Sequence, residues 1–163
     1  MKFILCYLSV LILLSADIIA QNFKAPRPSP DATITQYVGI TKITVDYSSP
    51  GVKERKIWGE LVPYGKIWRT GANEATHLKT NFDMVIGGVP LTKGTYTLWT
   101  FPTPAGWKFI INKQTGQWGT NYDERQDYAR FDAIVEQMET PVETLTVTFD
   151  ATSETSGRLK LMW

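Results

Sequence analysis

The sequence predicts an all-β protein, an antiparallel β-sandwich or jelly-roll-like fold of about nine strands. Apolar and polar residues alternate over several short segments, as they do along a strand with one buried face. Turn signals such as Gly87-Gly88 separate these segments, and no stretch keeps the apolar period of a long helix. A succession of short strands without helices is typical of antiparallel sheets packed face to face.

The predicted strands follow one another along the whole chain. Alternation is clearest over residues 78–86, where mostly apolar side chains at even positions predict a buried face and polar ones at odd positions an exposed face. Residues 95–101 are apolar on both faces, which is typical of a central strand. The predicted strands cover residues 33–38, 43–48, 78–86, 95–101, 107–111, 128–138, 142–149 and 158–163.

Two segments interrupt this series of strands. Residues 53–61 are the one candidate for a helix, and the nearby Pro63 keeps that helix short. Residues 112–127 form a long polar loop that carries Trp118, and long loops inside a compact domain often carry function. Tyr96 closely follows a turn glycine, so we expect its hydroxyl to bind nearby backbone and fix a corner of the sandwich.

The first twenty residues predict a signal peptide. Lys2 precedes a short apolar stretch, and a cut is expected near Ala20/Gln21. The apolar stretch is too short to span a bilayer comfortably, so we expect no membrane span after cleavage. We therefore predict a periplasmic or secreted protein. Residues 21–31 are predicted to be a proline-rich linker, and residues 32–163 a single β-sandwich domain.

Composition excludes several classes of function. The chain has 17 basic and 16 acidic residues, with no basic stripe, so nucleic-acid binding has no electrostatic support. Its one cysteine lies within the predicted signal peptide, which leaves no disulfide and no thiolate metal ligand. We expect neither a metal site nor a cofactor.

The run from residue 48 to residue 76, SSPGVKERKIWGELVPYGKIWRTGANEAT, is the most distinctive part of the chain. Its two tryptophans are best interpreted as plugs for one end of the sandwich. Arg69 and Glu74 could form an ion pair that holds the turn at residues 70–73, whose backbone amides could bind an anion. The phosphate-binding patterns GxxxxGK[ST] and GxGxxG are absent, so no nucleotide is expected.

Aromatic side chains beside polar loops give the better functional signal. Sugar and peptide ligands are typically held by aromatic faces together with a few fixed polar groups. Trp118 lies among polar residues, and we weigh a structural and a ligand-binding role for it about evenly. The predicted ligand-binding residues are Arg69, Asn73, Glu74 and Trp118.

Catalytic alternatives rest on fewer features. His77 is the only histidine and falls on the polar face of its strand, so we expect an exposed strand residue and not part of a triad or metal site. A pair of carboxylates could support hydrolysis, and the candidates are Glu60, Glu74 and Asp123. Spacing along the sequence does not say which of them lie close together.

The run at residues 48–76, together with LTKGTYTLWTFP and WKFIINKQTGQWG, closely resembles the bacterial family called domain of unknown function 2911. The resemblance covers about residues 28–163. It implies an exported, mostly β domain of the kind common in secreted proteins of Bacteroidota, and it brings no activity and no catalytic residues. Members of that family usually run on for another strand beyond the position of Trp163, so either the chain is truncated or its last strand lies unpaired at an edge.

Three functions remain open from the sequence, and enzymatic activity is not the favoured one. The leading prediction is non-catalytic binding of a small ligand, an oligosaccharide or a peptide. The second is a hydrolase of the cell envelope that uses carboxylates such as Glu74. The third is an accessory module of the envelope that binds another protein.

Overall fold

A computed structural model describes residues 25–163, so the predicted signal peptide and the start of the linker lie outside the described residues. The described chain contains ten strands and one short 3-10 helix, η1 (Glu124–Gln126). The strands are β1 (Asp31–Val38), β2 (Thr41–Ser48), β3 (His77–Thr80), β4 (Met84–Ile86), β5 (Val89–Leu91), β6 (Gly94–Thr103), β7 (Gly106–Asn112), β8 (Asp127–Ala133), β9 (Thr146–Asp150) and β10 (Arg158–Met162).

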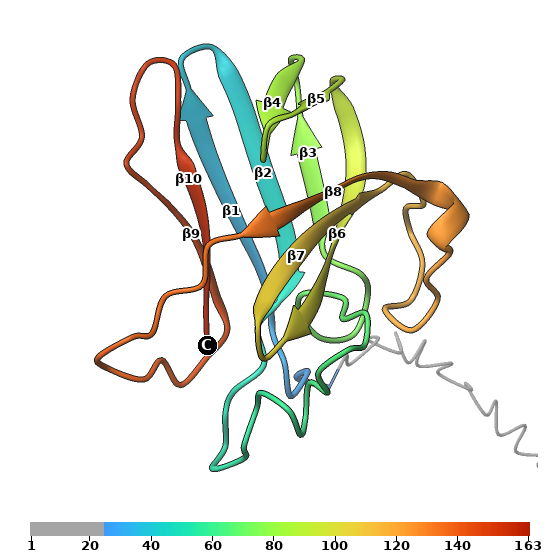
Figure 1. The fold of residues 1–163 in the computed structure, drawn as a ribbon, viewed down its shortest axis with the longest axis vertical. Helices are drawn as coiled ribbons and strands as arrows, with labels where there is room; N and C mark the ends of the chain where they lie inside the picture. The colour runs from blue at the N-terminus through green and yellow to red at the C-terminus, as the bar shows by residue number, and fades with distance from the viewer. Residues whose placement is uncertain (1–24) are drawn as a thin grey trace, which may run out of the picture.

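Six of the strands form one antiparallel sheet in the order β1-β2-β3-β6-β7-β8 (Figure 1). The register aligns Ile34, Val45, Leu78 and Tyr96 across four neighbouring strands. Successive side chains of a strand point to opposite faces, so these residues share one face of the sheet. This common face is apolar and forms the inner wall of the main core.

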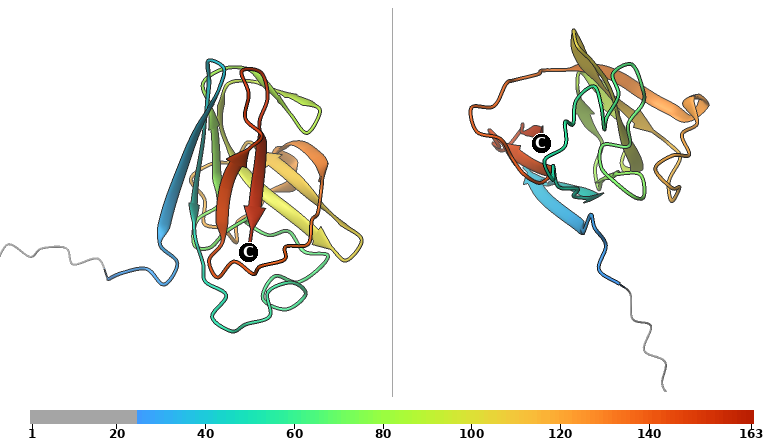
Figure 2. Two further views of the ribbon diagram at one scale, coloured as in Figure 1. Left: turned by 90° about the vertical axis from the view of Figure 1, so that its left-hand side faces the viewer. Right: turned by 90° about the horizontal axis from the view of Figure 1, so that it is seen from below.

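Two antiparallel hairpins, β9–β10 and β4–β5, cover that apolar face (Figures 1 and 2). Phe149, Leu159 and Leu161 of the first hairpin, and Met84 and Ile86 of the second, pack against the core of the large sheet. The β9 strand lies next to β1 at one edge of the molecule. The predicted all-β antiparallel sandwich is thus confirmed, with ten strands in place of about nine.

The opposite face of the large sheet carries a smaller apolar cluster. Trp99 and Ile110 are buried there, and Tyr122 of the loop at residues 112–127 packs against them. The indole Nε1 of Trp99 donates a hydrogen bond to Oγ1 of Thr97 at 2.9 Å. The long polar loop therefore folds back over this second face of the sheet.

The candidate helix at residues 53–61 does not form. Lys53 and Glu54 have left-handed φ values of 50° and 59°, and Gly59 has φ of 87°, so the backbone turns repeatedly. Trp58 instead forms an isolated bridge with Val62.

Three predicted strands are shorter than expected. The single strand predicted at residues 78–86 divides into β3 and β4, because Thr80 Oγ1 donates to the carbonyl oxygen of Phe82 at 2.7 Å and closes a turn. The strand predicted at residues 128–138 ends at Ala133, and the one predicted at residues 142–149 begins only at Thr146.

Two smaller expectations are met by the fold. The hydroxyl of Tyr96 donates to the carbonyl oxygen of Thr92 at 2.9 Å, which is the backbone contact that fixes a corner. The tryptophans of the distinctive run meet at one end of the sandwich, where Trp58 lies 5.7 Å from Trp68 between ring centroids. Among residues 25–163, no helix is long and apolar enough to cross a membrane.

Candidate functional site

The turn at residues 70–73 contains two residues in the left-handed region of backbone conformation. Thr70 and Asn73 both have φ of 55°, which costs free energy for a residue with a Cβ atom, less so for asparagine. Thr76 Oγ1 donates to the carbonyl oxygen of Thr70 at 3.0 Å, and Thr70 itself is fully buried. The turn is therefore held in place by its surroundings.

Asn73 connects this turn to two other segments. Its Nδ2 donates to Oγ of Ser48 at 3.1 Å and to the carbonyl oxygen of Ser29 at 3.2 Å. Ser48 ends β2, and Ser29 lies just before β1. Because both contacts are internal to the protein, Asn73 positions the backbone of the turn.

The loop at residues 112–127 brings Trp118 to the same turn. Glu74 and Trp118 face each other in an isolated antiparallel bridge, and the amide of Gly119 donates to the carbonyl oxygen of Asn73 at 3.0 Å. Gly119 is buried against Arg69, and a Cβ at this position would overlap Cδ of Arg69. All four predicted site residues therefore lie in one region of the molecule.

The predicted ion pair between Arg69 and Glu74 is wrong. Glu74 pairs instead with Arg27, whose two guanidinium nitrogens donate to the two carboxylate oxygens at 2.8 and 2.7 Å. This bidentate contact raises the pKa of the Arg27 guanidinium above its usual value, with Asp31 adding to the effect. The sequence placed Arg27 in a linker, where nothing indicated that it folds back onto the domain.

Arg69 is the unpaired cation of the site. Its side chain is half-buried, and its Nε atom is buried with no hydrogen-bond partner among residues 25–163. Within the same part of the chain, no carboxylate forms a salt bridge with its guanidinium. Burial lowers the pKa of Arg69 below its ordinary value. Trp118, on the neighbouring loop, leaves 48% of its surface exposed.

The other candidate carboxylates have partners that explain them. Glu60 forms a surface pair with Lys56 at 3.1 Å. Asp123 caps η1 by accepting a hydrogen bond from the amide of Arg125 at 3.1 Å, and it also pairs with the Arg125 guanidinium. Those contacts lower the pKa of Asp123. Residues 25–163 contain no group of three or more His, Cys, Asp or Glu side chains that could hold a metal.

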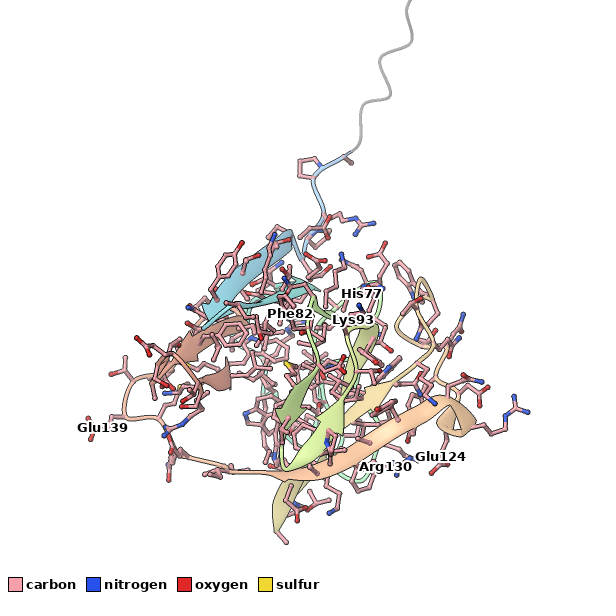
Figure 3. All side chains as sticks on the ribbon, turned by 90° about the horizontal axis from the view of Figure 1, so that it is seen from above. His77, Phe82, Lys93, Glu124, Arg130 and Glu139 are labelled. Carbon is pink, nitrogen blue, oxygen red and sulfur yellow. The ribbon has the colours of Figure 1, made fainter. Side chains whose placement is uncertain are left out.

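His77 is half-buried, although the sequence predicted an exposed residue. Its Nε2 accepts a hydrogen bond from the amide of Gly116 at 3.3 Å, so the loop at residues 112–127 covers it. Burial, with a smaller contribution from Lys79, lowers the pKa of His77 below 6.5, and the charges of Asp46 and Glu74 partly oppose this shift. A neutral imidazole with an accepting Nε2 fits a role in anchoring the loop. Figure 3 labels His77, the first residue of β3, seen from above.

A hollow lies on the other face of the large sheet, where the sequence gave no indication of a site. A cavity of about 760 Å³ separates β6, β7 and β8 from the β9–β10 hairpin, and we call it the interlayer cavity. Its lining includes Phe109, Phe131, Phe149, Leu159 and Leu161. Alternation predicts that such residues point inward, but it does not report how far apart two layers stand.

The chain is thus an antiparallel β-sandwich with an aromatic and cationic surface at one end and an apolar cavity between its layers. The sequence profile of the family described as a protein of unknown function (DUF2911) matches residues 29–163, and the chain belongs to this family. No curated protein and no solved structure matches the chain.

Proposed function

We propose that this domain binds a small ligand without catalysis, and that the ligand is an oligosaccharide or a peptide that carries a carboxylate. One observation carries this proposal: Arg69, whose buried Nε lacks a hydrogen-bond partner among residues 25–163, packs against Gly119, the neighbour of the half-exposed Trp118. The surface formed by Arg69, Asn73, Glu74 and Trp118 is called here the Arg69–Trp118 surface.

The unpaired charge of Arg69 points to an anionic group on the ligand. Removing a guanidinium from water without a compensating partner is unfavourable, and a carboxylate can restore two parallel hydrogen bonds. A bound carboxylate would also stabilise the charged form of Arg69, whose pKa is lowered by burial in the free protein. The chemistry of this residue therefore favours uronic-acid sugars and acidic or C-terminal peptides over neutral ligands.

Trp118 supplies the apolar half of the proposed contact. An indole face stacks on the ring of a sugar or on a peptide side chain, and it contributes contact area with little loss of conformational freedom. The backbone bridge to Glu74 fixes the main chain of Trp118 relative to the turn, and its side chain stays 48% exposed. Asn73 and Glu74 act in this proposal as positioning residues, because their side chains already bind Ser48 and Arg27.

The hydrolase alternative would place chemistry on Glu74. Both carboxylate oxygens of Glu74 accept hydrogen bonds from Arg27, an arrangement that serves structure better than proton transfer. This favours the binding role. We further propose that binding takes place outside the cytoplasm, which the signal-peptide pattern of residues 1–20 and the lack of cysteine after residue 20 support.

The test is a binding screen with matched variants. Wild-type protein is titrated by calorimetry with oligogalacturonates and with peptides that end in a free carboxylate, and the same ligands are repeated as methyl esters and amides. Arg69→Gln is expected to weaken binding about tenfold to a hundredfold, since hydrogen bonds to charged groups contribute about 1.5–3 kcal/mol. Trp118→Ala is expected to weaken it while leaving the protein folded.

Arg125→Gln is the matched control, because Arg125 lies in the same loop region and its side chain is 88% exposed. It should bind like wild type. Equal affinity of Arg69→Gln and wild type for the free acids, or equal affinity of wild type for acids and esters, would reject the proposed role of Arg69.

A further inference from the structure

The interlayer cavity leaves inward-facing apolar side chains only partly buried. Protein interiors normally pack to the density of organic crystals, with few voids larger than a water molecule. Here Phe109, Phe131, Phe149, Leu159 and Leu161 all point between the layers, yet each keeps accessible surface because it faces the cavity. A space of about 760 Å³ falls within the roughly 300–1,000 Å³ of typical small-molecule sites.

The cavity opens where the two layers fail to meet. β8 and β10 are terminal strands of their sheets, and the chain between β8 and β9 passes outside without pairing with either (Figures 1 and 2). Ile134 is 88% exposed and Val135 is 59% exposed on this segment, and both line the cavity. In Figure 3, Glu139 of this segment lies on the left, and Glu124 of η1, which precedes β8, lies on the right. Exposed apolar side chains therefore surround the opening.

Different groups line the two ends of the cavity along the strands. At one end Gly87 packs so tightly on Phe131 that a Cβ would overlap the ring, which seats the β4–β5 turn on β8. At the other end Trp58 and Trp107 stand edge to face with ring centroids 4.6 Å apart, and Trp163 completes the wall. The exposed side chains of Ile134 and Val135 place an entrance at the side, next to the end of β8.

One polar atom at the tryptophan end lacks a partner. Nε1 of Trp163 is buried, and no group among residues 25–163 accepts its hydrogen bond. An indole N–H buried without an acceptor is unfavourable, and buried tryptophans usually find one. The basic residues at the rim are already paired with the carboxylate of Asp150. Nζ of Lys160 lies 3.1 Å from its Oδ2, and Nε of Arg158 lies 3.7 Å from its Oδ1.

We infer that the interlayer cavity binds an uncharged, elongated apolar molecule with a hydroxyl or carbonyl oxygen at one end. The apolar part would fill the space between the phenylalanine and leucine side chains, and the oxygen would accept the hydrogen bond of Trp163 Nε1 after a small rotation of the indole, because this atom is shielded from solvent in the free protein. A neutral donor and paired rim charges favour an alcohol or ester over a fatty acid. The β4–β5 turn at one end, the tryptophans at the other and the volume favour a small molecule over a strand from another protein. This site lies on the opposite face of the large sheet from the loop that carries Trp118, and it does not depend on the proposed function.

Binding of the neutral dye N-phenyl-1-naphthylamine tests the site, with 1-decanol and decane as competitors. Wild-type protein should enhance dye fluorescence, and decanol should displace the dye. Ala133→Trp should abolish dye binding, because Ala133 pairs in register with Trp107, lines the cavity and would fill it with a large ring. Ala105→Trp, the same substitution at an exposed turn outside the cavity lining, should bind the dye like wild type.

Trp163→Phe tests the hydrogen bond separately. It should weaken decanol binding about twofold to tenfold, the usual contribution of one hydrogen bond, and leave decane binding unchanged. Circular dichroism shows whether this variant is folded. If it is not, the Ala133→Trp result still tests the cavity. The inference would be overturned if wild type did not bind the dye, or if Ala133→Trp and Ala105→Trp bound it equally well. It would also be overturned if light scattering showed a dimer and the dye bound only after the dimer dissociated. Arg69→Gln should leave all these measurements unchanged.

Discussion

Gly119 links the loop at residues 112–127 to the Arg69–Trp118 surface, and its replacement gives a direct test of that geometry. A Cβ at this position would overlap Cδ of Arg69 and lie 2.6 Å from the carbonyl oxygen of Asn73. The arginine side chain can move, but the carbonyl belongs to a turn that is fixed by buried contacts and accepts the Gly119 amide at 3.0 Å. Gly119→Ala must therefore displace the loop or the turn.

The expected cost of Gly119→Ala follows from overpacking of a buried site. Inserting one methyl group without space typically costs about 1–3 kcal/mol, which corresponds to a lower Tm by about 3–10 °C in a protein of this size. The assay is thermal unfolding followed by circular dichroism, with urea unfolding as a second measure. Because Arg69 is displaced, affinity for carboxylate ligands should fall together with stability.

Gly106→Ala provides the matched control for this substitution. No atom lies within 4 Å of a Cβ built on Gly106, and its φ is outside the left-handed region, so the change should stay within about 0.5 kcal/mol. If Gly119→Ala unfolds at the same temperature as Gly106→Ala, then the loop does not pack on Asn73 and Arg69 as described. The reasoning about the site would then lose its geometric basis.

Three further predictions follow from individual contacts. Burial lowers the pKa of His77 from 6.5, so the unfolded chain binds more protons than the folded one below that pH. The free energy of unfolding in urea should therefore fall as the pH is lowered from about 7 to about 5. His77→Gln should lack the part of this pH dependence that His77 causes. Tyr96→Phe removes the hydroxyl contact with Thr92 and should lower the free energy of unfolding in urea by about 0.5–1.5 kcal/mol. If Tyr96→Phe costs the same in a Thr92→Val background, the contact with the Thr92 carbonyl matters and the contact with its hydroxyl does not. Glu74→Gln should leave Tm nearly unchanged, since both side chains of its ion pair with Arg27 are exposed and the pair positions Glu74 locally without stabilising the whole fold; a Tm lower by several degrees would contradict this.

Alternation along the sequence predicted the strands well, because one buried face imposes a period of two. Residues 43–48 and 95–101 correspond closely to β2 and β6. Local turn chemistry was harder to predict: the candidate helix at residues 53–61 fails because Lys53 and Glu54 adopt left-handed φ values, which neither residue type indicates. Strand ends near Ala133 and Thr146 were also misplaced, since the intervening segment is apolar enough to suggest pairing that does not occur.

The candidate site was predicted in part for a similar reason. The residue types around Arg69 and Trp118 indicated a polar and aromatic surface, and the structure brings the two segments together through the Glu74–Trp118 bridge and the packing of Gly119 on Arg69. The partner of Glu74 could not be predicted, because Arg27 lies 47 positions away along the chain and its segment carries no periodic pattern. The interlayer cavity was equally hidden, since it depends on the distance between two layers and not on any single strand.

The two proposed sites use opposite faces of the same strand, and this arrangement constrains how they can act. Leu98 of β6 faces the interlayer cavity, and the next residue, Trp99, packs beneath the loop that carries Trp118. Both side chains are almost fully buried, so β6 is held from both sides and has little freedom to transmit a displacement. A ligand that fills the cavity changes contacts on one face, whereas a carboxylate at Arg69 changes charge at a turn beyond the other face. Coupling between them would require β6 to adopt two arrangements, and a strand paired on both sides with buried residues on both faces favours one arrangement only.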